Sequence, residues 1–273
     1  MAQNKQQIVI ERIQEFFRQI LTLKSSEMMK QYLEFCGRVP NHSMFNNTLV
    51  FIQKPSCYYY ATKSQWEKRF NRKLKPSARP LLILFPFAPV EFVYDLEDTV
   101  GKPLPKNFLY WWLEEKGGIS KEKFENLIKL CEELRIKTSI APSDYLHKEG
   151  HKTFGIAYRK LDDNKRGIEL HPRYNDPEEL QEAFGVLVHE IAHHLLGHCG
   201  EMNIRGILIA KDARHNDRSV REVEAELAAW LLFSKYGITK RSAEYLVAWI
   251  NEQNAKSARI TEVCKTADNI YKG

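Results

Sequence analysis

Residues 176–198, DPEELQEAFGVLVHEIAHHLLGH, predict a long helix that carries two histidines on one side. Asp176 and Pro177, followed by two glutamates, are typical of a helix start: they supply a capping side chain, a proline at the first helical position and acids in the first turn. His189 and His193 are four residues apart, so both imidazoles leave the helix on the same side, about one turn apart. Two imidazoles at this spacing can bind one zinc ion.

Glu190 follows the first of these histidines and is the expected general base. Zinc lowers the pKa of a bound water to about 7, and a neighbouring carboxylate can accept the proton that this water loses. The alternative is a helix with surface histidines. We favour a metal site because the helix is apolar on most sides, and polar side chains inside an apolar helix need partners. The apolar residues are Leu180, Phe184, Leu187, Val188, Ile191 and Leu195.

A third metal ligand is expected from a later helix at about residues 220–235. At about 100° per residue, its apolar face contains Val220, Val223, Leu227, Leu231 and Ser234. Glu224 projects at the flank of this face, where a carboxylate is costly unless it is paired or binds a metal. Glu224 is therefore the preferred third ligand. Glu222 and Glu226 are expected to point away into solvent, with Glu222 as the second choice.

A third ligand on the first helix is not expected. The metzincin pattern requires glycine seven residues and histidine ten residues after the first histidine. Leu196 and Cys199 occupy these positions. His194 and His198 are therefore expected to contact the ligands or to lie on the surface, rather than to bind the metal.

The positive charge of the chain is concentrated in residues 63–79. This segment holds seven of the 41 basic residues and one of the 35 acidic residues, so it accounts for the whole net charge of +6. Cations that bind phosphate and rings that stack on bases are typical of single-stranded nucleic-acid sites. The alternative is that the rings belong to the core and the charges form a solvated surface. The candidate nucleic-acid-binding residues are Tyr59, Lys63, Trp66, Lys68, Arg69, Arg72, Lys73, Lys75 and Arg79.

Composition points to a globular protein of the cytoplasm. Of the 273 residues, 43% are hydrophobic and 28% are charged, and no apolar run approaches the roughly 18 residues that span a bilayer. The N-terminal residues have the pattern of an amphipathic helix rather than of a secretion signal. The five scattered cysteines indicate reduced thiols rather than disulfides or a thiolate metal site. No membrane partner is expected, and the oligomeric state is left open.

Turn-rich segments near residues 101–107 and 116–118 favour two domains, at residues 1–115 and 119–273, with an α+β architecture overall. The first is expected to be a small mixed α/β domain with helices at about 8–35, 45–52 and 64–70 and strands at 58–60, 81–87 and 90–94. The second is expected to be mostly helical, with helices at about 121–134, 176–198, 220–235, 241–251 and 261–271. It also holds a hairpin at 154–170, which is either a plain sheet edge or an edge to which a peptide substrate adds.

HEIAHHLLGH (189–198), followed about thirty residues later by EVEAELAAWLL (222–232), resembles the ImmA/IrrE-type metallopeptidases. These are gluzincin-like proteins with a zincin-like domain, in which a glutamate before an alanine on the second helix is a metal ligand. The resemblance implies Glu224-Ala225 for that role and zinc (Zn2+) as the cofactor. Known members of that family cleave transcriptional repressors.

The N-terminal half resembles the ArdC-type antirestriction domain, which binds single-stranded DNA. The resemblance lies in NNTLVFIQ (46–53), the tyrosines at 58–60, SQW (64–66), the basic turn before LLILFPF (81–87), and DLEDT (95–99). ArdC-type proteins also join this domain to a zinc-peptidase-like one.

Two functional hypotheses follow. The first is a zinc metalloendopeptidase that acts on a protein or peptide, which is expected to be a DNA-associated protein such as a repressor. The second is an antirestriction or mobile-element DNA-binding protein whose zinc site is structural or inactive. Both are compatible if each domain has its own activity.

Overall fold

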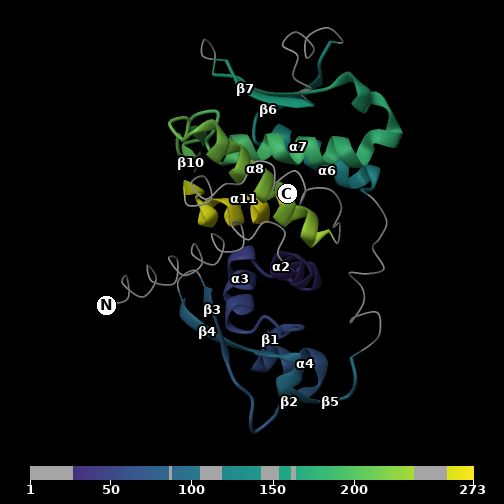
Figure 1. The fold of residues 1–273 in the computed structure, drawn as a ribbon, viewed down its shortest axis with the longest axis vertical. Coiled ribbons are helices and arrows are strands. Elements are labelled where there is room, and N and C mark those ends of the chain that lie inside the picture. Colours follow the sequence, from purple (N-terminus) through teal and green to yellow (C-terminus); the bar gives the residue numbers. More distant parts are fainter. Residues whose placement is uncertain (1–26, 86–87, 105–118, 143–153, 161–163, 237–256) are drawn as a thin grey trace. The chain divides into compact units, whose positions relative to one another are not determined.

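The computed structural model describes residues 27–85, 88–104, 119–142, 154–160, 164–236 and 257–273, and its architecture is α+β, as predicted (Figure 1). The chain forms two compact units. The first comprises residues 1–116 and 233–255, and the second comprises residues 117–232 and 256–273.

The first unit combines helices with short antiparallel strands. A three-stranded sheet has the order β1-β4-β3, and β2 pairs separately with β5. Local capping defines the helix starts, because the Ser43 hydroxyl accepts the Asn46 N–H, and Thr62 and Gln65 form a reciprocal capping box. The elements are α2 (Glu27–Arg38), α3 (Met44–Gln53), β1 (Tyr60–Thr62), α4 (Lys63–Phe70), β2 (Arg72–Leu74), β3 (Leu81–Phe85), β4 (Ala88–Asp95), a 3-10 turn (Leu96–Asp98) and β5 (Thr99–Gly101).

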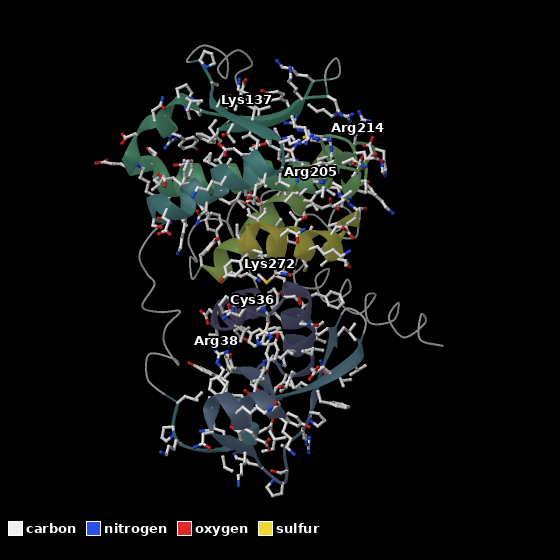
Figure 2. All side chains as sticks on the ribbon, turned by 180° about the vertical axis from the view of Figure 1, so that it is seen from behind. Cys36, Arg38, Lys137, Arg205, Arg214 and Lys272 are labelled. Carbon is white, nitrogen blue, oxygen red and sulfur yellow. The ribbon has the colours of Figure 1, made fainter. Side chains whose placement is uncertain are left out.

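Helices α2 and α3 form an aromatic core with the sheet. Phe51 lies 5.3 Å from Tyr32 and 5.7 Å from Phe35, centroid to centroid, and Phe35 stacks on Tyr60 at 6.1 Å. All four rings are buried. Arg38, which is labelled in Figure 2, lies at the end of α2. Its Nε donates to the Tyr58 carbonyl at 3.2 Å, which joins the helix to the segment before β1.

Helix α3 also occupies the outer edge of β3. The side-chain amide of Asn46 exchanges two hydrogen bonds with the backbone of Leu84, at 3.0 and 3.1 Å. The amide of Gln53 does the same with Leu82, at 2.8 and 2.9 Å. These side-chain amides hydrogen-bond to the backbone N–H and C=O groups with which a further strand would pair, so they protect β3 from edge-to-edge pairing.

Trp66 anchors α4 to the sheet. Its side chain is 0% exposed and packs with Ala61, Leu104 and neighbouring rings. The indole Nε1 donates to the Tyr94 carbonyl at 2.9 Å. Both the ring surface and the N–H group of the indole are therefore used in contacts within the first unit.

Replacing Trp66 with Ala is expected to lower the free energy of unfolding of the first unit by about 3–5 kcal/mol. The loss combines the buried indole surface with a Tyr94 carbonyl left without its donor. Urea unfolding followed by circular dichroism measures it. A cost below about 1 kcal/mol, the size expected for a surface substitution, would contradict the core position.

The second unit places α7 between a three-stranded sheet and the helices α8 and α11 (Figure 1). The sheet has the order β6-β8-β7, with β6 parallel and β7 antiparallel to β8. The elements are α6 (Lys121–Glu133), β6 (Ile136–Ile140), β7 (Gly155–Arg159), β8 (Arg166–Leu170), two 3-10 turns (Pro172–Asn175 and Pro177–Glu179), α7 (Leu180–Leu195), β9 (Met202–Ile204), β10 (Ile207–Ala210), α8 (Arg218–Lys235), which belongs to this unit up to residue 232, and α11 (Ile260–Lys272).

Several predicted boundaries differ from the observed ones. The first strand is shifted from 58–60 to Tyr60–Thr62, because the Asp95 carboxylate accepts the Tyr58 N–H at 3.1 Å and replaces a strand partner. The proline-led start at 177 is a 3-10 turn rather than part of α7. The parallel strand β6 was not predicted. The predicted helix at 241–251, residues 8–26 of the first predicted helix and the linker segment 105–118 lie outside the described residues. Within the described ranges, no helix is both long and apolar enough to cross a membrane.

Candidate metal site

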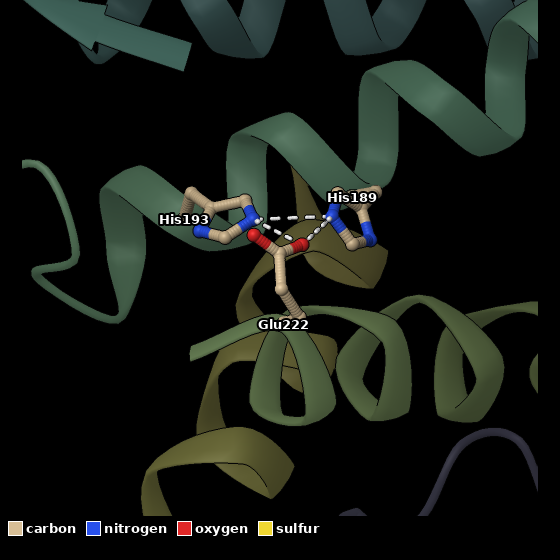
Figure 3. A group of neighbouring side chains, drawn as sticks. All are labelled: His189, His193 and Glu222. Atoms are coloured by element: carbon tan, nitrogen blue, oxygen red, sulfur yellow. Dashed lines mark hydrogen bonds and ion pairs between the residues drawn. The ribbon is translucent and has the colours of Figure 1, made fainter. Parts of the chain in front are cut away.

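Helix α7 presents His189 and His193 side by side. Their Nε2 atoms are 3.1 Å apart (Figure 3). The helix is held from several sides by buried apolar residues, including Phe184, Leu187 and Ile191. The two histidine side chains remain 15% and 13% exposed. The predicted i, i+4 pair is therefore formed on one side of a fixed helix.

Glu222 of α8 completes a group of three ligand atoms. Its Oε2 lies 3.3 Å from Nε2 of His189 and 3.6 Å from Nε2 of His193 (Figure 3). Two ligand atoms that each lie about 2.0–2.1 Å from a tetrahedral zinc ion are about 3.3–3.4 Å apart. The three observed separations bracket this value, so the residues fit a tetrahedral ion. Among the described residues, this is the group found that could hold a metal.

Glu224, the preferred ligand from the sequence, does not lie with the histidine pair. It is 0% exposed, and its Oε2 is 2.9 Å from Nε2 of His198 and 2.6 Å from Nη2 of Arg259. The expectation that Glu222 and Glu226 point away into solvent is wrong. Helix α8 is buried on several sides, so its most apolar face does not identify the side that meets α7. Glu224 faces α11, whereas Glu222 and Glu226 face α7.

Glu226 supports the first histidine. Its Oε2 lies 3.0 Å from Nδ1 of His189. Because a carboxylate only accepts hydrogen bonds, Nδ1 of His189 carries a proton, and Nε2, which faces Glu222, is the nitrogen that binds a metal once its own proton is displaced. Such outer partners orient the ring and strengthen its basicity toward a metal. Sequence reasoning missed this role, although the Glu222-x-x-x-Glu226 spacing places both carboxylates on one side of a helix.

Glu190 is buried beside this group. Burial raises its pKa to about 7, and the N–H of Ala157 on β7 donates a hydrogen bond to its carboxylate. Gly155 leaves room for the side chain, because a Cβ at that position would lie 3.1 Å from Glu190 Oε1 and 2.5 Å from Val186 Cγ1. The glycine at the start of β7 therefore belongs to the site, and no sequence signal marked it.

The three candidate ligands have pKa values that are shifted in different directions. Burial lowers the pKa of His189, but hydrogen bonds with Glu222 and Glu226 outweigh it and raise the pKa to about 10. Burial lowers the pKa of His193 to about 4. Burial raises the pKa of Glu222, but its bonds with the two histidines hold the pKa well below its usual range. An ionised carboxylate beside imidazole nitrogens is a donor set that zinc accepts.

The other two histidines of the motif bond to protein groups. His194 is fully buried, with Nε2 3.1 Å from the Gly167 carbonyl and Nδ1 3.3 Å from Arg166. The Nδ1 atom of His198 lies 2.9 Å from the Nδ1 atom of His193. His194 thus joins α7 to β8, and His198 contacts a candidate ligand.

The candidate nucleic-acid residues divide into two sets. Trp66 lies in the core and cannot stack on a base. Tyr59 is half-buried against the rings of Trp66 and Phe70. Arg72 is committed to the fold, because it donates to Thr99 and to the Lys102 carbonyl. The exposed set comprises Lys63, Lys68, Arg69, Lys73, Lys75 and Arg79.

Comparison with known proteins found one similar solved structure. It is the crystal structure of the antirestriction ArdC protein from the R388 plasmid, in its metal-free form. The TM-score is 0.42 at 14% sequence identity, and the match covers 84% of this chain and 83% of that chain. No known family and no curated protein matches this chain. The neighbour is of the ArdC type that the N-terminal resemblance led us to expect, whereas the ImmA/IrrE-type resemblance has no counterpart among the comparisons. At this identity and TM-score, we draw neither an activity nor a partner from the likeness.

Proposed function

We propose that this chain is a zinc-dependent hydrolase of peptide bonds. His189, His193 and Glu222 would hold the ion, and Glu190 would act as general base. The observation that carries the proposal is the separation of the three ligand atoms, 3.1 to 3.6 Å, which fits a tetrahedral ion.

The site residues suit the hydrolysis of an amide. When bound, zinc supplies Lewis-acid catalysis and makes water a good nucleophile at neutral pH. The Glu190 carboxylate accepts a proton from the attacking water, whose oxygen adds to the substrate carbonyl carbon. As the carbon–nitrogen bond breaks, Glu190 returns the proton to the leaving amine nitrogen. In the metal-free site, burial raises the pKa of the Glu190 carboxyl group to about 7, and a general acid or base works best with a pKa near the operating pH.

The edge strand β7 supports a peptide as the substrate. β7 pairs with β8 on one side only in the described sheet, and its Ala157 N–H reaches the Glu190 carboxylate. An extended peptide that adds to β7 would therefore pass the general base. The basic Arg159 at the end of this strand would equally discourage unwanted strand pairing.

The number of ligands separates this proposal from a structural zinc site. Structural sites close all four positions with protein ligands, whereas catalytic sites use three and keep one for water or substrate. The ligand group found among the described residues has three members, and their side chains are 13–21% exposed. Both features support a catalytic rather than a structural zinc site, and neither of them bears on an antirestriction or mobile-element role of the chain.

As a second function, we propose that the first unit binds single-stranded DNA. The whole net charge of the chain lies in residues 63–79, and six of the seven basic side chains there are exposed. Since Trp66 and Tyr59 pack in the unit, they are not the rings that stack on bases. Phe92 on β4, which is 54% exposed, is the better candidate.

Changing Arg69 and Lys73 together to Ala is expected to weaken binding of a labelled oligo(dT) strand and to make it less salt-dependent. Each phosphate contact contributes about 0.7 to the slope of log affinity against log salt, so the slope should fall by about 1.4. Fluorescence anisotropy across a salt series measures both effects. The charge-matched control is Lys121 and Lys265 changed to Ala, since both are exposed lysines of the second unit. Equal losses in the two double variants would reject a specific site.

A further inference from the structure

A chain of four side chains runs from the candidate ligand His193 to α11. Nδ1 of His193 lies 2.9 Å from Nδ1 of His198. Nε2 of His198 lies 2.9 Å from Oε2 of Glu224. Arg259 then donates to Glu224 from its backbone N–H at 2.6 Å and from its guanidinium at 2.6–3.2 Å. His198 and Glu224 are buried at 3% and 0% exposure.

Hydrogen-bond donors and acceptors must alternate along this chain. The Glu224 carboxylate only accepts, so Nε2 of His198 carries a proton and donates it. A neutral His198 then has a lone pair on Nδ1, which accepts a hydrogen bond from Nδ1–H of His193. A neutral His193 with its proton on Nδ1 has its lone pair on Nε2, the atom that faces His189 and Glu222.

The opposite arrangement would disable the site. If Nε2 of His198 accepted a hydrogen bond, its Nδ1 would carry the proton, and Nδ1 of His193 would have to accept. The proton of His193 would then sit on Nε2 and block metal binding. Nη2 of Arg259 lies 3.2 Å from Nε2 of His198 and could stabilise this arrangement. The shorter contact with the carboxylate, at 2.9 Å, favours the productive one.

Arg259 also donates one hydrogen bond to the end of α7. Its Nη2 donates to Glu224 Oε2 at 2.6 Å and to the Leu196 carbonyl at the end of α7 at 2.8 Å. The guanidinium therefore spans from α8 to the end of α7. A carboxylate buried this deeply needs such a partner to stay ionised.

We infer that Glu224 and His198 are positioning residues, which set the tautomer of His193 so that its Nε2 can bind the metal. Arg259 keeps Glu224 charged and in place, so the C-terminal helix contributes to the site. The inference rests on the proposed metal-dependent function. It also gives Glu224 a role that explains a buried acid on α8 without making it a ligand. Glu226 holds the Nδ1 proton of His189 by direct contact, whereas Glu224 acts on His193 through His198.

Glu224→Gln is expected to weaken zinc binding about 10–100-fold, the range found for outer partners of metal ligands. Gln keeps the shape but can donate as well as accept, so it no longer fixes the proton on Nε2 of His198. Competition with a chromophoric zinc chelator measures the dissociation constant. The matched control is His194→Gln, another fully buried polar side chain next to His193, whose partners lie on β8 and its neighbours. Its zinc affinity should stay within about twofold of the wild type.

A purely structural role would give a different result. Glu224→Gln would then lower the melting temperature of the metal-free protein while leaving the zinc dissociation constant within twofold, and this outcome overturns the inference. An equal loss of affinity in His194→Gln would overturn it as well, because any damage to the core would then have the same effect.

Nitrogen-15 NMR of the metal-free wild-type protein tests the inference without a variant. His193 is expected to carry its proton on Nδ1, and His198 on Nε2. The reverse pattern overturns the inference even if Glu224→Gln fails to fold. If the wild type binds no zinc, the proposed function fails, and the tautomers in this experiment still decide whether Glu224 sets the proton of His193.

Discussion

Replacing Glu190 with Gln is expected to lower peptide hydrolysis about 10²–10⁴-fold, the usual contribution of a general base, while the protein keeps its zinc. Gln has nearly the same shape, and its side-chain oxygen can still accept the Ala157 N–H. It cannot accept a proton from water at neutral pH. The ligand atoms of His189, His193 and Glu222 are unchanged, so metal content should stay at the wild-type level.

The measurement needs a broad substrate, because the natural one is unknown. A pool of unstructured peptides, incubated with zinc-loaded protein and analysed by mass spectrometry, shows every cleaved bond. Zinc content, measured by plasma mass spectrometry on the same samples, serves as the control. Cleavage at equal rates by both proteins, or by neither, would reject the peptidase proposal for these substrates.

Replacing Glu222 with Gln is expected to weaken zinc binding by more than about 100-fold, beyond the range found for outer partners. A neutral amide removes one of three ligands and the only negative charge among them. Glu226→Gln, which leaves the three ligands in place, should cost about 10–100-fold. A larger loss of zinc affinity in Glu222→Gln than in Glu226→Gln and Glu224→Gln would distinguish a metal ligand from side chains that act through a histidine.

Chelator competition on the three variants measures this order, and circular dichroism of the metal-free proteins controls for folding. If Glu224→Gln had the largest effect and Glu222→Gln had almost none, the ligand would be Glu224, and α8 would have to turn relative to α7 when the metal binds. Equal affinities in all variants and the wild type would mean that zinc binds elsewhere.

Local spacing was sufficient to predict the histidine pair. His189 and His193 lie on one side of α7 because four residues make about one helical turn, whatever surrounds the helix. The hairpin of β7 and β8 was equally local, since alternating residues and a turn define it. The concentration of charge in residues 63–79 is a property of the sequence and needs no fold.

The third ligand depends on the tertiary structure. Glu222, Glu224 and Glu226 are all on α8, and which of them meets α7 depends on the rotation of α8 about its axis. That rotation is defined by contacts with residues far apart in sequence, such as the bonds from Arg259 to Glu224. A helical face computed from hydrophobicity assumes one buried side, whereas α8 is buried on several.

The same distinction applies to the basic segment. Its charge could be read directly, but the sequence does not say whether Trp66 and Arg72 face solvent. The Trp66 indole donates its hydrogen bond to the Tyr94 carbonyl. The Arg72 guanidinium donates to the Thr99 hydroxyl and to the Lys102 carbonyl. The sequence by itself determined the chemical types and their spacing along each helix. Only the packing of helices and strands decided which side chains meet, because such contacts depend on the orientation of elements distant in the chain.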